Sequence, residues 1–312
     1  MQNSKNKKKI ITLIGPTACN KTSTAVHLIK EFPISIIGVD SVQIYKRFNI
    51  GSAKPPQEIL EKYKHHLVDS ADPENIFSVK DFYDQAYRLV MQAHSNNKIP
   101  LLVGGTMMYF NTLFKGINDI PEGNEAIREE LQRELDKRGA DKLFNDLKEI
   151  DPETAKTIKK NDKQRIIRAL EVFKISGKRI SEFKKETTEN VFEEFEFINI
   201  GIFPSDREIL QGRIRERIIE MINMGLIKEA QEIIKLGNIA KNHPALNSIN
   251  YKEAIQVING KLNASELEEK CVISTRQLVK RQLTWMRSFV FSKTFDINST
   301  KEIEEFIDEQ IF

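Results

Sequence analysis

The chain has 312 residues and a net charge of only +3, from 48 basic and 45 acidic residues. This length allows a sizeable core, in one large α/β domain with an insertion or in two domains. The charge balance gives no whole-protein field that would indicate a nucleic-acid partner, so only local clusters of charge can indicate one. No stretch reaches the roughly 18 to 20 apolar residues of a membrane helix, and residues 1–9 lack the apolar core of a signal peptide. Cys19 and Cys271 fit neither a metal-ligand spacing nor a disulfide framework, so we predict a cytoplasmic protein.

The first predicted element is an apolar strand over residues 10–14, followed by a turn and a helix. Successive N–H groups of such a turn, with the N-terminus of the helix, hold phosphoryl oxygens. Lys21 would reach a bridging or terminal phosphate, and the Thr22 hydroxyl would ligate a magnesium ion carried by that phosphate. The alternative is an ordinary strand-to-helix turn. We predict a phosphate site made of Gly15, Pro16, Thr17, Ala18, Cys19, Asn20, Lys21 and Thr22.

Asn20 departs from the phosphate-loop motif Gly-x-x-x-x-Gly-Lys-Ser/Thr, which has its second glycine at this position. Asparagine is the best non-glycine residue at positive φ, so the loop conformation can survive. Its side chain nevertheless occupies space where backbone should approach the phosphate. We expect weakened but not abolished binding.

A second apolar run, residues 34–39, predicts a buried parallel strand that ends at Asp40. Ligands of open α/β sheets lie beyond the carboxyl ends of strands, so Asp40 is directed at the same crevice as Lys21. A carboxylate beside a bound phosphate is repelled by it unless it has a function, such as metal binding or general base catalysis. The alternative is that Asp40 only caps a turn or helix. The long loop that follows, residues 42–56, is of the kind that tends to be functional.

The strand predicted over residues 99–103 ends in Gly104, Gly105 and Thr106, where a phosphate-loop NTPase would place an acidic residue. We expect the two glycines to leave space for a closely approaching ligand and Thr106 to offer a hydroxyl. His65 and His66, on a short strand, face opposite ways and are interpreted as structural.

Helical patterns dominate residues 116–190, with helices predicted over 126–137, 140–148 and 163–176. We therefore divide the chain into a first part of the core (1–115), a helical insertion (116–190), and a core completion with C-terminal helices (191–312). Within the insertion, Gln164, Arg165 and Arg168 fall within one turn and form a basic stripe that faces a partner or simply solvent.

Strand character returns over residues 195–203, and a helix is predicted over 206–223 with Arg213 and Arg217 on one face, either of which could complete an anion site. In a later helix, Arg276, Lys280 and Arg287 fall roughly on one side, beside the single tryptophan, Trp285. A basic helix face of this kind suits contact with a phosphate backbone.

Together these segments resemble the bacterial type of the tRNA dimethylallyltransferase family over nearly the whole chain. The resemblance is carried by the following motifs in this order: Gly15–Ala18 with Lys21 and Thr22, Asp40 and Ser41 with residues 43–45, Gly51–Pro55, Gly104–Thr106, Asp162–Glu171, and residues 280–282 with Thr284, Trp285 and Arg287. Asn250 differs from the glycine that usually precedes Tyr251 in the family. Like Asn20, it can preserve a left-handed backbone.

The resemblance implies a phosphate-loop-type open parallel sheet flanked by helices, with an α-helical insertion domain. It also implies transfer of a dimethylallyl group from dimethylallyl diphosphate to N6 of the adenosine 3′ to the anticodon (position 37) of tRNA. In this hypothesis Lys21, Thr22 and Arg217, with Mg2+, neutralise the leaving diphosphate. Asp40 accepts the N6 proton of the flipped adenine, and Thr17 and Thr106 border the reacting centre.

The same resemblance implies that the anticodon stem-loop is bound by residues from several segments, and that the protein is a monomer without a membrane partner. The residues implied to bind tRNA are Asp40, Ser41, Val42, Gln43, Thr106, Arg128, Gln164, Arg165, Ile166, Ile167, Arg168, Lys280, Arg281, Gln282 and Arg287.

Three alternatives remain open from the sequence. The acceptor could be free adenosine monophosphate, as in the adenylate isopentenyltransferases. The chain could be a phosphate-loop nucleoside or metabolite kinase, although Gly104–Thr106 argues against this. It could also be a catalytically impaired tRNA-binding relative, because of Asn20.

Overall fold

The structure is a computed structural model that describes residues 7–185, 190–240 and 242–311. The chain divides into two compact units, which we describe separately. Unit 1 comprises Met1–Phe114 and Val191–Phe312, and unit 2 comprises Lys115–Asn190. In the described parts of the chain, no helix is both long and apolar enough to span a membrane.

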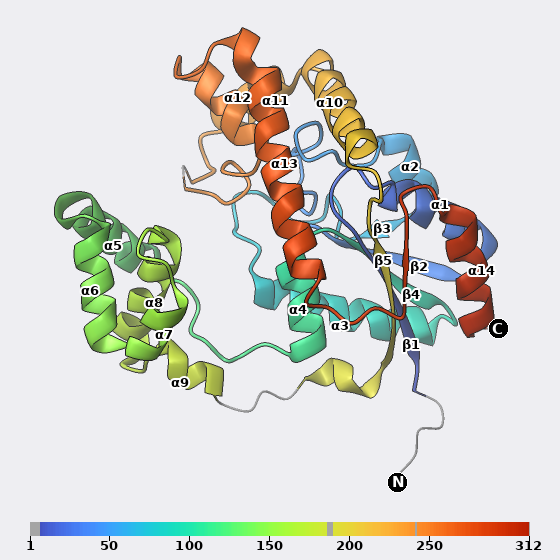
Figure 1. The fold of residues 1–312 in the computed structure, drawn as a ribbon, viewed down its shortest axis with the longest axis horizontal. Coiled ribbons are helices and arrows are strands. Elements are labelled where there is room, and N and C mark those ends of the chain that lie inside the picture. The colour runs from blue at the N-terminus through green and yellow to red at the C-terminus, as the bar shows by residue number, and fades with distance from the viewer. Residues whose placement is uncertain (1–6, 186–189, 241, 312) are drawn as a thin grey trace. The chain divides into compact units, whose positions relative to one another are not determined.

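Unit 1 is built on a six-stranded sheet in which every pair of neighbours is parallel, in the order β3-β2-β4-β1-β5-β6 (Figure 1). The central strands are buried on both faces, which is why they read in the sequence as continuous apolar runs. The predicted open parallel α/β sheet is confirmed. Its strands are β1 (Lys9–Ile14), β2 (Ile34–Val39), β3 (His65–His66), β4 (Ile99–Gly104), β5 (Glu196–Ile202) and β6 (Lys293–Phe295).

The register brings the carboxyl ends of four strands to one edge of the sheet. Strand β4 lies between β2 and β1, and its last residue, Gly104, is level with Val39 on one side and Ile14 on the other. Ile14 is in turn level with Gly201 of β5. The segments that follow these strands therefore begin side by side, as expected for a ligand site of an open α/β sheet.

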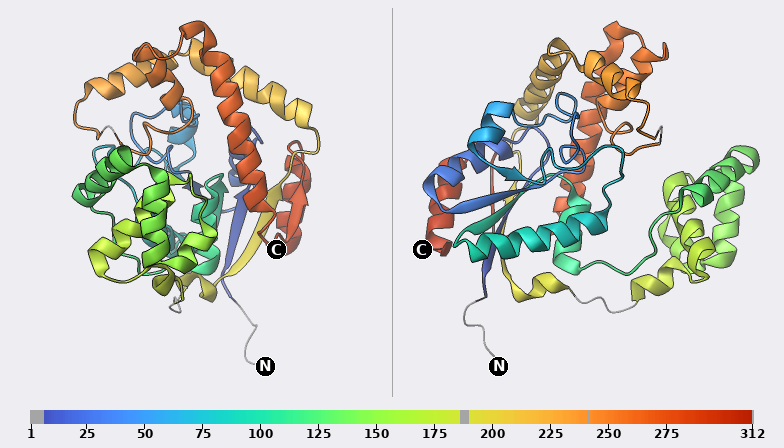
Figure 2. Two further views of the ribbon diagram at one scale, coloured as in Figure 1. Left: turned by 60° about the vertical axis from the view of Figure 1, so that its left-hand side comes forward. Right: turned by 180° about the vertical axis from the view of Figure 1, so that it is seen from behind.

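Helices cover both faces of the sheet, and a further group lies beyond the carboxyl ends of the strands (Figures 1 and 2). Helices α1 (Lys21–Glu31) and α14 (Thr300–Ile311) share a buried cluster with β1, β2, β4 and β5. The other helices of unit 1 are α2 (Gln57–Lys62), α3 (Val79–Ser95), α4 (Met107–Lys115), α10 (Arg207–Asn223), α11 (Leu226–Lys235), α12 (Tyr251–Ile258) and α13 (Leu267–Met286).

Unit 2 is helical, and polar caps fix where its helices begin. The side chains of Asn124, Asp151 and Asp162 each accept a hydrogen bond from the first turn of the helix that follows. Gly177, at φ 69°, ends α8 in the left-handed conformation. The helices are α5 (Glu125–Arg138), α6 (Ala140–Ile150), α7 (Pro152–Thr157), α8 (Lys163–Ser176) and α9 (Ile180–Lys185), so the prediction for α8 matches its observed bounds.

Candidate functional site

The turn between β1 and α1, here called the cradle, contains the residues of the predicted phosphate site. Asn20 has φ 55° and ψ 16°, so the expected left-handed conformation is present. Gly15 lies close to β5, where an added Cβ would be 3.2 Å from Cβ of Ile202. The Lys21 ammonium folds back over the turn and donates to the Pro16 carbonyl at 2.6 Å.

Two cations with lowered pKa values face this cradle. Burial lowers the pKa of Lys21 to about 8, with a smaller contribution from the nearby charge of Arg217, while Asp40 opposes the shift. Burial likewise lowers the pKa of Arg217, again against the attraction of Asp40. Glu220 also attracts Arg217 and lines the cavity around the cradle, but Arg213 and Lys30 line it as well, so cations outnumber carboxylates there, which favours an anion.

Asp40 follows β2 directly and has one carboxylate oxygen engaged. Its Oδ1 accepts the backbone N–H groups of Val42 at 2.9 Å and Gln43 at 3.1 Å, so the capping role considered from the sequence is present. In the described part of the chain, no hydrogen bond uses Oδ2. This second oxygen is therefore available as an acceptor.

The Gly104–Thr106 segment packs closely against neighbouring protein on one side. An added Cβ would lie 2.0 Å from the Val39 carbonyl oxygen at Gly104 and 2.6 Å from Gln282 Nε2 at Gly105, so the glycines permit close packing of β2 and of Gln282. Both glycines also line a cavity of ≈ 860 Å³, so they adjoin space in which a ligand can lie. The Thr106 hydroxyl accepts the Ser41 N–H at 3.0 Å and so holds the turn that follows Asp40.

Gln282, expected to contact tRNA, is buried and connects two parts of the cradle. Its Nε2 donates to the Gly105 carbonyl at 2.9 Å, and its Oε1 accepts the Thr17 N–H at 3.1 Å. Helix α13 thereby holds the first turn of the phosphate loop. No local sequence pattern indicates this contact, because its partners are far away in the chain.

Two cavities of unit 1 meet at this site. A cavity of ≈ 860 Å³ surrounds the cradle and α1, and one of ≈ 490 Å³ is lined largely by apolar side chains of α4, α10 and α13. The residues that line both are Thr17, Ala18, Asp40, Ser52, Gly105, Arg217 and Gln282. A polar compartment and an apolar compartment thus adjoin at Asp40 and Arg217.

Most predicted diphosphate residues line the polar cavity, which includes Thr17 to Thr22. Gly15 and Pro16 shape the turn beneath it. Arg213, one turn before Arg217, also lines this cavity. Its Nη2 donates to Asn298 at 2.8 Å, whereas its buried Nη1 has no partner in the described structure. An unpaired buried guanidinium nitrogen at an anion cavity indicates a further anion ligand.

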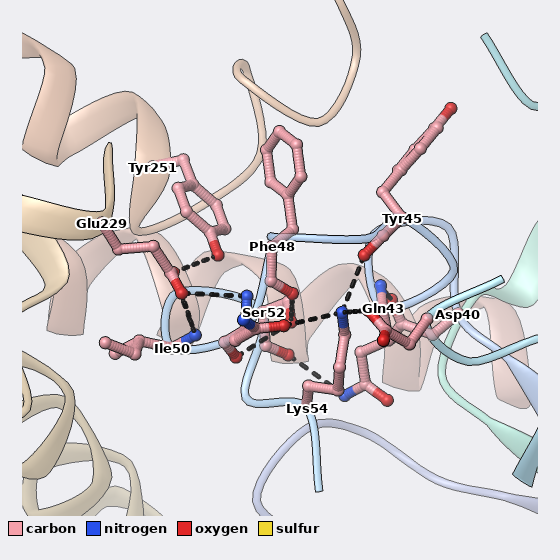
Figure 3. Close-up of polar contacts among 11 residues, drawn as sticks. Asp40, Gln43, Tyr45, Phe48, Ile50, Ser52, Lys54, Glu229 and Tyr251 are labelled. Carbon is pink, nitrogen blue, oxygen red and sulfur yellow. Dashed lines mark hydrogen bonds and ion pairs between the residues drawn. The ribbon is translucent and has the colours of Figure 1, made fainter. Parts of the chain in front are cut away.

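The loop after Asp40 is ordered by side chains that reach across it (Figure 3). Gln43 Nε2 donates to the carbonyls of Ser52 and Ala53, at 3.1 Å each. Arg217 also donates to the Ala53 carbonyl, at 3.2 Å. One short segment therefore contacts both the turn that holds Asp40 and the arginine of the anion cavity.

Helix α13 presents the predicted basic residues in two groups. Arg281 and Trp285 line the apolar cavity, and Trp285 is 38% exposed, so it is not a core residue. Lys280 and Arg287 are exposed and line neither cavity. Ser41, Val42 and Thr106 lie in the apolar cavity wall.

The residues of the predicted basic stripe in unit 2 differ in their exposure. Gln164 and Arg165 are exposed, and Ile167 is half-buried, whereas Ile166 is fully buried in the core of the unit. Because the Ile166 side chain is enclosed, it cannot contact RNA, and that part of the prediction is corrected.

Arg128 and Arg168 pair with the buried carboxylate of Glu171, at 2.8 and 2.6 Å. Glu171 also accepts the Asn124 N–H at 2.8 Å. The sequence did not single out Glu171 as the partner of these arginines, since a glutamate on an amphipathic helix usually faces solvent.

The predicted magnesium ligand, Thr22, is exposed at the first turn of α1 and lines the polar cavity. Among the described residues, no group of three or more His, Cys, Asp or Glu side chains could hold a metal ion. A hydroxyl at the cradle fits a Mg2+ ion that takes most of its ligands from diphosphate oxygens and water. Cys19 and Cys271 are free and buried, and burial raises their pKa values to about 11 and about 12.

Comparison with known proteins gives the family. The model of the family described as IPP transferase matches residues 43–289, which is most of the chain. The chain belongs to the IPP transferase family. The predicted family resemblance is confirmed.

Two curated relatives extend this match over nearly the full length. The chain is 38% identical over 301 residues to the tRNA dimethylallyltransferase of Vesicomyosocius okutanii, covering 96% of this chain and 98% of the relative. It is also 38% identical to the Legionella pneumophila (strain Paris) protein of the same name, over 97% and 99%. The crystal structure of the tRNA isopentenylpyrophosphate transferase of Bacillus halodurans is similar, with a TM-score of 0.69, 33% identity, and coverage of 98% and 97%.

Proposed function

We propose that this IPP transferase family member transfers a dimethylallyl group from dimethylallyl diphosphate to N6 of adenosine 37 in tRNA, acting in the cytoplasm as a monomer. The observation that carries the proposal is the meeting of an anion cavity and an apolar cavity at Asp40 and Arg217. A diphosphate fits the first, and a flipped adenine with an allylic chain fits the second. The names of the curated relatives support the same activity.

In this proposal the cradle binds the donor through its diphosphate. Backbone N–H groups of the loop and the cations of Lys21 and Arg217 bind its oxygens, and these contacts strengthen as negative charge builds on the leaving group. Mg2+, held by Thr22 and the diphosphate, would supply further charge neutralisation. Thr17 borders the reacting centre, since it lines both cavities.

Asp40 acts as the general base. An exocyclic aromatic amine is a weak nucleophile, so it needs a base positioned at its N–H. Two backbone N–H groups fix Oδ1 of Asp40, which leaves Oδ2 to accept the N6 proton as the C–N bond forms and the allylic C–O bond breaks. The products are N6-isopentenyladenosine and diphosphate.

We assign tRNA binding to both units. In unit 1 the assigned residues lie at the two cavities or along α13. Ser41, Val42, Thr106 and Arg281 line the apolar cavity, Gln43 lines the polar cavity, Lys280 is exposed on α13, and Arg287 follows the end of that helix. In unit 2, Gln164 and Arg165 are exposed and are assigned to the phosphate backbone, although Arg165 also pairs with Asp162 at 3.3 Å. Arg128 and Arg168 are partly exposed, and each pairs with Glu171.

The decisive experiment incubates the purified protein with unmodified tRNA, dimethylallyl diphosphate and Mg2+, and then measures nucleoside masses after digestion. An isopentenyl-sized gain on one adenosine is expected, and it should disappear with Asp40→Ala while tRNA affinity remains nearly unchanged. Equal loss of binding and turnover would contradict the general-base role. Binding of tRNA without a mass gain would instead identify an impaired relative, and Asn20→Gly would then be the next variant.

A further inference from the structure

Glu229 of α11 holds a cluster of backbone N–H groups from a loop far away in the sequence (Figure 3). Its carboxylate accepts the N–H groups of Asn49 at 3.1 Å, Ile50 at 2.9 Å and Gly51 at 3.1 Å. The hydroxyl of Tyr251 donates to the same carboxylate at 2.6 Å. Three consecutive N–H groups around one anion form a nest, and each bond is charge-assisted.

The loop held in this way contacts both functional groups of the proposed reaction. Just after Gly51, the carbonyls of Ser52 and Ala53 accept from Gln43, whose own N–H donates to Asp40. The Ala53 carbonyl also accepts from Arg217. A displacement of this loop would therefore move the base and the diphosphate arginine together.

The loop has little regular structure of its own to hold it. Between β2 and α2, its described residues form one isolated bridge, from Tyr45 to Ala71. Backbone hydrogen bonds join its first part to residues 69–71, as from the Ser70 N–H to the Ile44 carbonyl at 2.8 Å. Side chains also hold the loop: Asn250 Nδ2 donates to the Gly51 carbonyl at 2.9 Å, and Lys54 donates to the Tyr45 carbonyl at 2.7 Å. Gly51 packs so tightly against Tyr251 that an added Cβ would lie 2.6 Å from its ring.

We propose that Glu229 is a positioning residue of the prenyl transfer, which acts by anchoring residues 49–53 and thereby aligning Asp40 and Arg217. This inference rests on the proposed function. Glu229 itself lines neither of the two cavities, so it does not touch the reacting atoms. We expect substitution of Glu229 to lower kcat and to weaken the contact of Arg217 with diphosphate, with tRNA affinity unchanged.

The test compares Glu229→Gln with Glu232→Gln on the same helix. Glu232 is 66% exposed and pairs with Lys228 at 3.9 Å, so its variant controls for the loss of one negative charge from α11. We expect Glu229→Gln to lower kcat by about tenfold and Glu229→Ala by about a hundredfold, because small displacements of reacting groups have effects of this size. Glu229→Asp should restore part of the loss, and Glu232→Gln should behave as wild type.

A purely stabilising role is distinguished by two further measurements at a temperature where every variant is folded. Hydrogen exchange of the amides of residues 49–51 should accelerate in Glu229→Gln and remain slow in Glu232→Gln. The affinity for tRNA should also stay at the wild-type value while kcat falls, which a general loss of structure would not produce. Normal kcat with slow exchange overturns the proposal, as does a loss of activity that only matches a loss of folded protein.

Failure of the proposed function would be visible separately. Inorganic diphosphate, measured by calorimetry, should bind Glu229→Gln several-fold more weakly than wild type, because Arg217 loses its alignment. If wild-type protein gave no prenylated tRNA, the exchange and diphosphate data would still decide the role of Glu229. Unchanged diphosphate affinity together with slow exchange would overturn that role.

Discussion

Lys21 lies in a cavity that lowers its pKa to about 8, so its charge depends on pH in the free protein. A diphosphate is bound by the ammonium form, and kcat/KM reports the ionisation of the free enzyme. We therefore expect kcat/KM for dimethylallyl diphosphate to be flat below this pKa and to fall about tenfold per pH unit above it. The measurement is a pH profile from 6 to 10, with Lys21→Arg as the control that keeps its charge; a flat wild-type profile would contradict the assignment.

The buried ammonium group of Lys21 should lower the free energy of unfolding at neutral pH. Because the pKa of Lys21 is lowered from 10.5 to about 8, the unfolded chain binds more protons between these values, and stability rises with pH across that window. The penalty is largest below pH 8 and vanishes near 10.5. Lys21→Met should raise the free energy of unfolding at pH 7 by on the order of 2 kcal/mol. Urea titrations at pH 7 and pH 10 should show the gain shrinking at the higher pH, and an equal gain at both would refute this explanation.

Arg213 contributes an unpaired Nη1 to the polar cavity. If it binds diphosphate, Arg213→Gln should weaken the binding of inorganic diphosphate by about tenfold or more, since a buried charge-assisted contact is lost. Arg215→Gln is a matched control, because Arg215 points away to Glu268 and Glu269 on α13. Equal affinity in the two variants, measured by calorimetry, would remove Arg213 from the site.

At the scale of elements, the helices of unit 2 are joined to the segment before α5 by the buried carboxylate of Glu171. Glu171→Ala leaves two arginines without their partner and should destabilise unit 2 by about 3 kcal/mol. Glu130→Gln is the control: its pair with Lys174 is on the surface, where water and salt screen the attraction, so its loss should change stability little. Thermal unfolding measured by circular dichroism checks both, and similar melting temperatures would contradict a structural role for Glu171.

Elements whose signals are local could be predicted from the sequence, whereas contacts between distant elements could not. Apolar runs gave β1, β2, β4 and β5, and the cap at Asp162 with Gly177 gave the bounds of α8. Asparagine in place of glycine correctly indicated positive φ at Asn20 and Asn250.

The same local signals could not assign partners to Gln282 or Glu229. Each of these side chains is polar and lies on an amphipathic helix, and each binds backbone groups more than a hundred residues away. Periodicity and turn residues therefore predict the fold and the conformation of the β1–α1 turn. The contacts that hold the loops in place cannot be predicted in this way, because they join residues far apart in the sequence.

For the whole molecule, the net charge of +3 is too small to draw in RNA, so its affinity must come from local clusters. Exposed cations occur in both units: Lys280 and Arg287 on unit 1, and Arg165 on unit 2, where Arg165 is 65% exposed. Each cation that neutralises one RNA phosphate adds its share to the slope of log Kd against log salt.

We therefore expect Lys280→Ala and Arg165→Ala each to weaken tRNA binding and to reduce that slope by about 0.7 to 0.9, and the double variant to reduce it by about twice as much. The rate of prenyl transfer at saturating tRNA should stay close to wild type, because neither residue lines the two cavities. Filter binding between about 50 and 200 mM salt measures the slope. An unchanged slope in Arg165→Ala alone would remove Arg165 from the RNA surface, and a fall in the saturated rate would instead place the residue at the reaction itself.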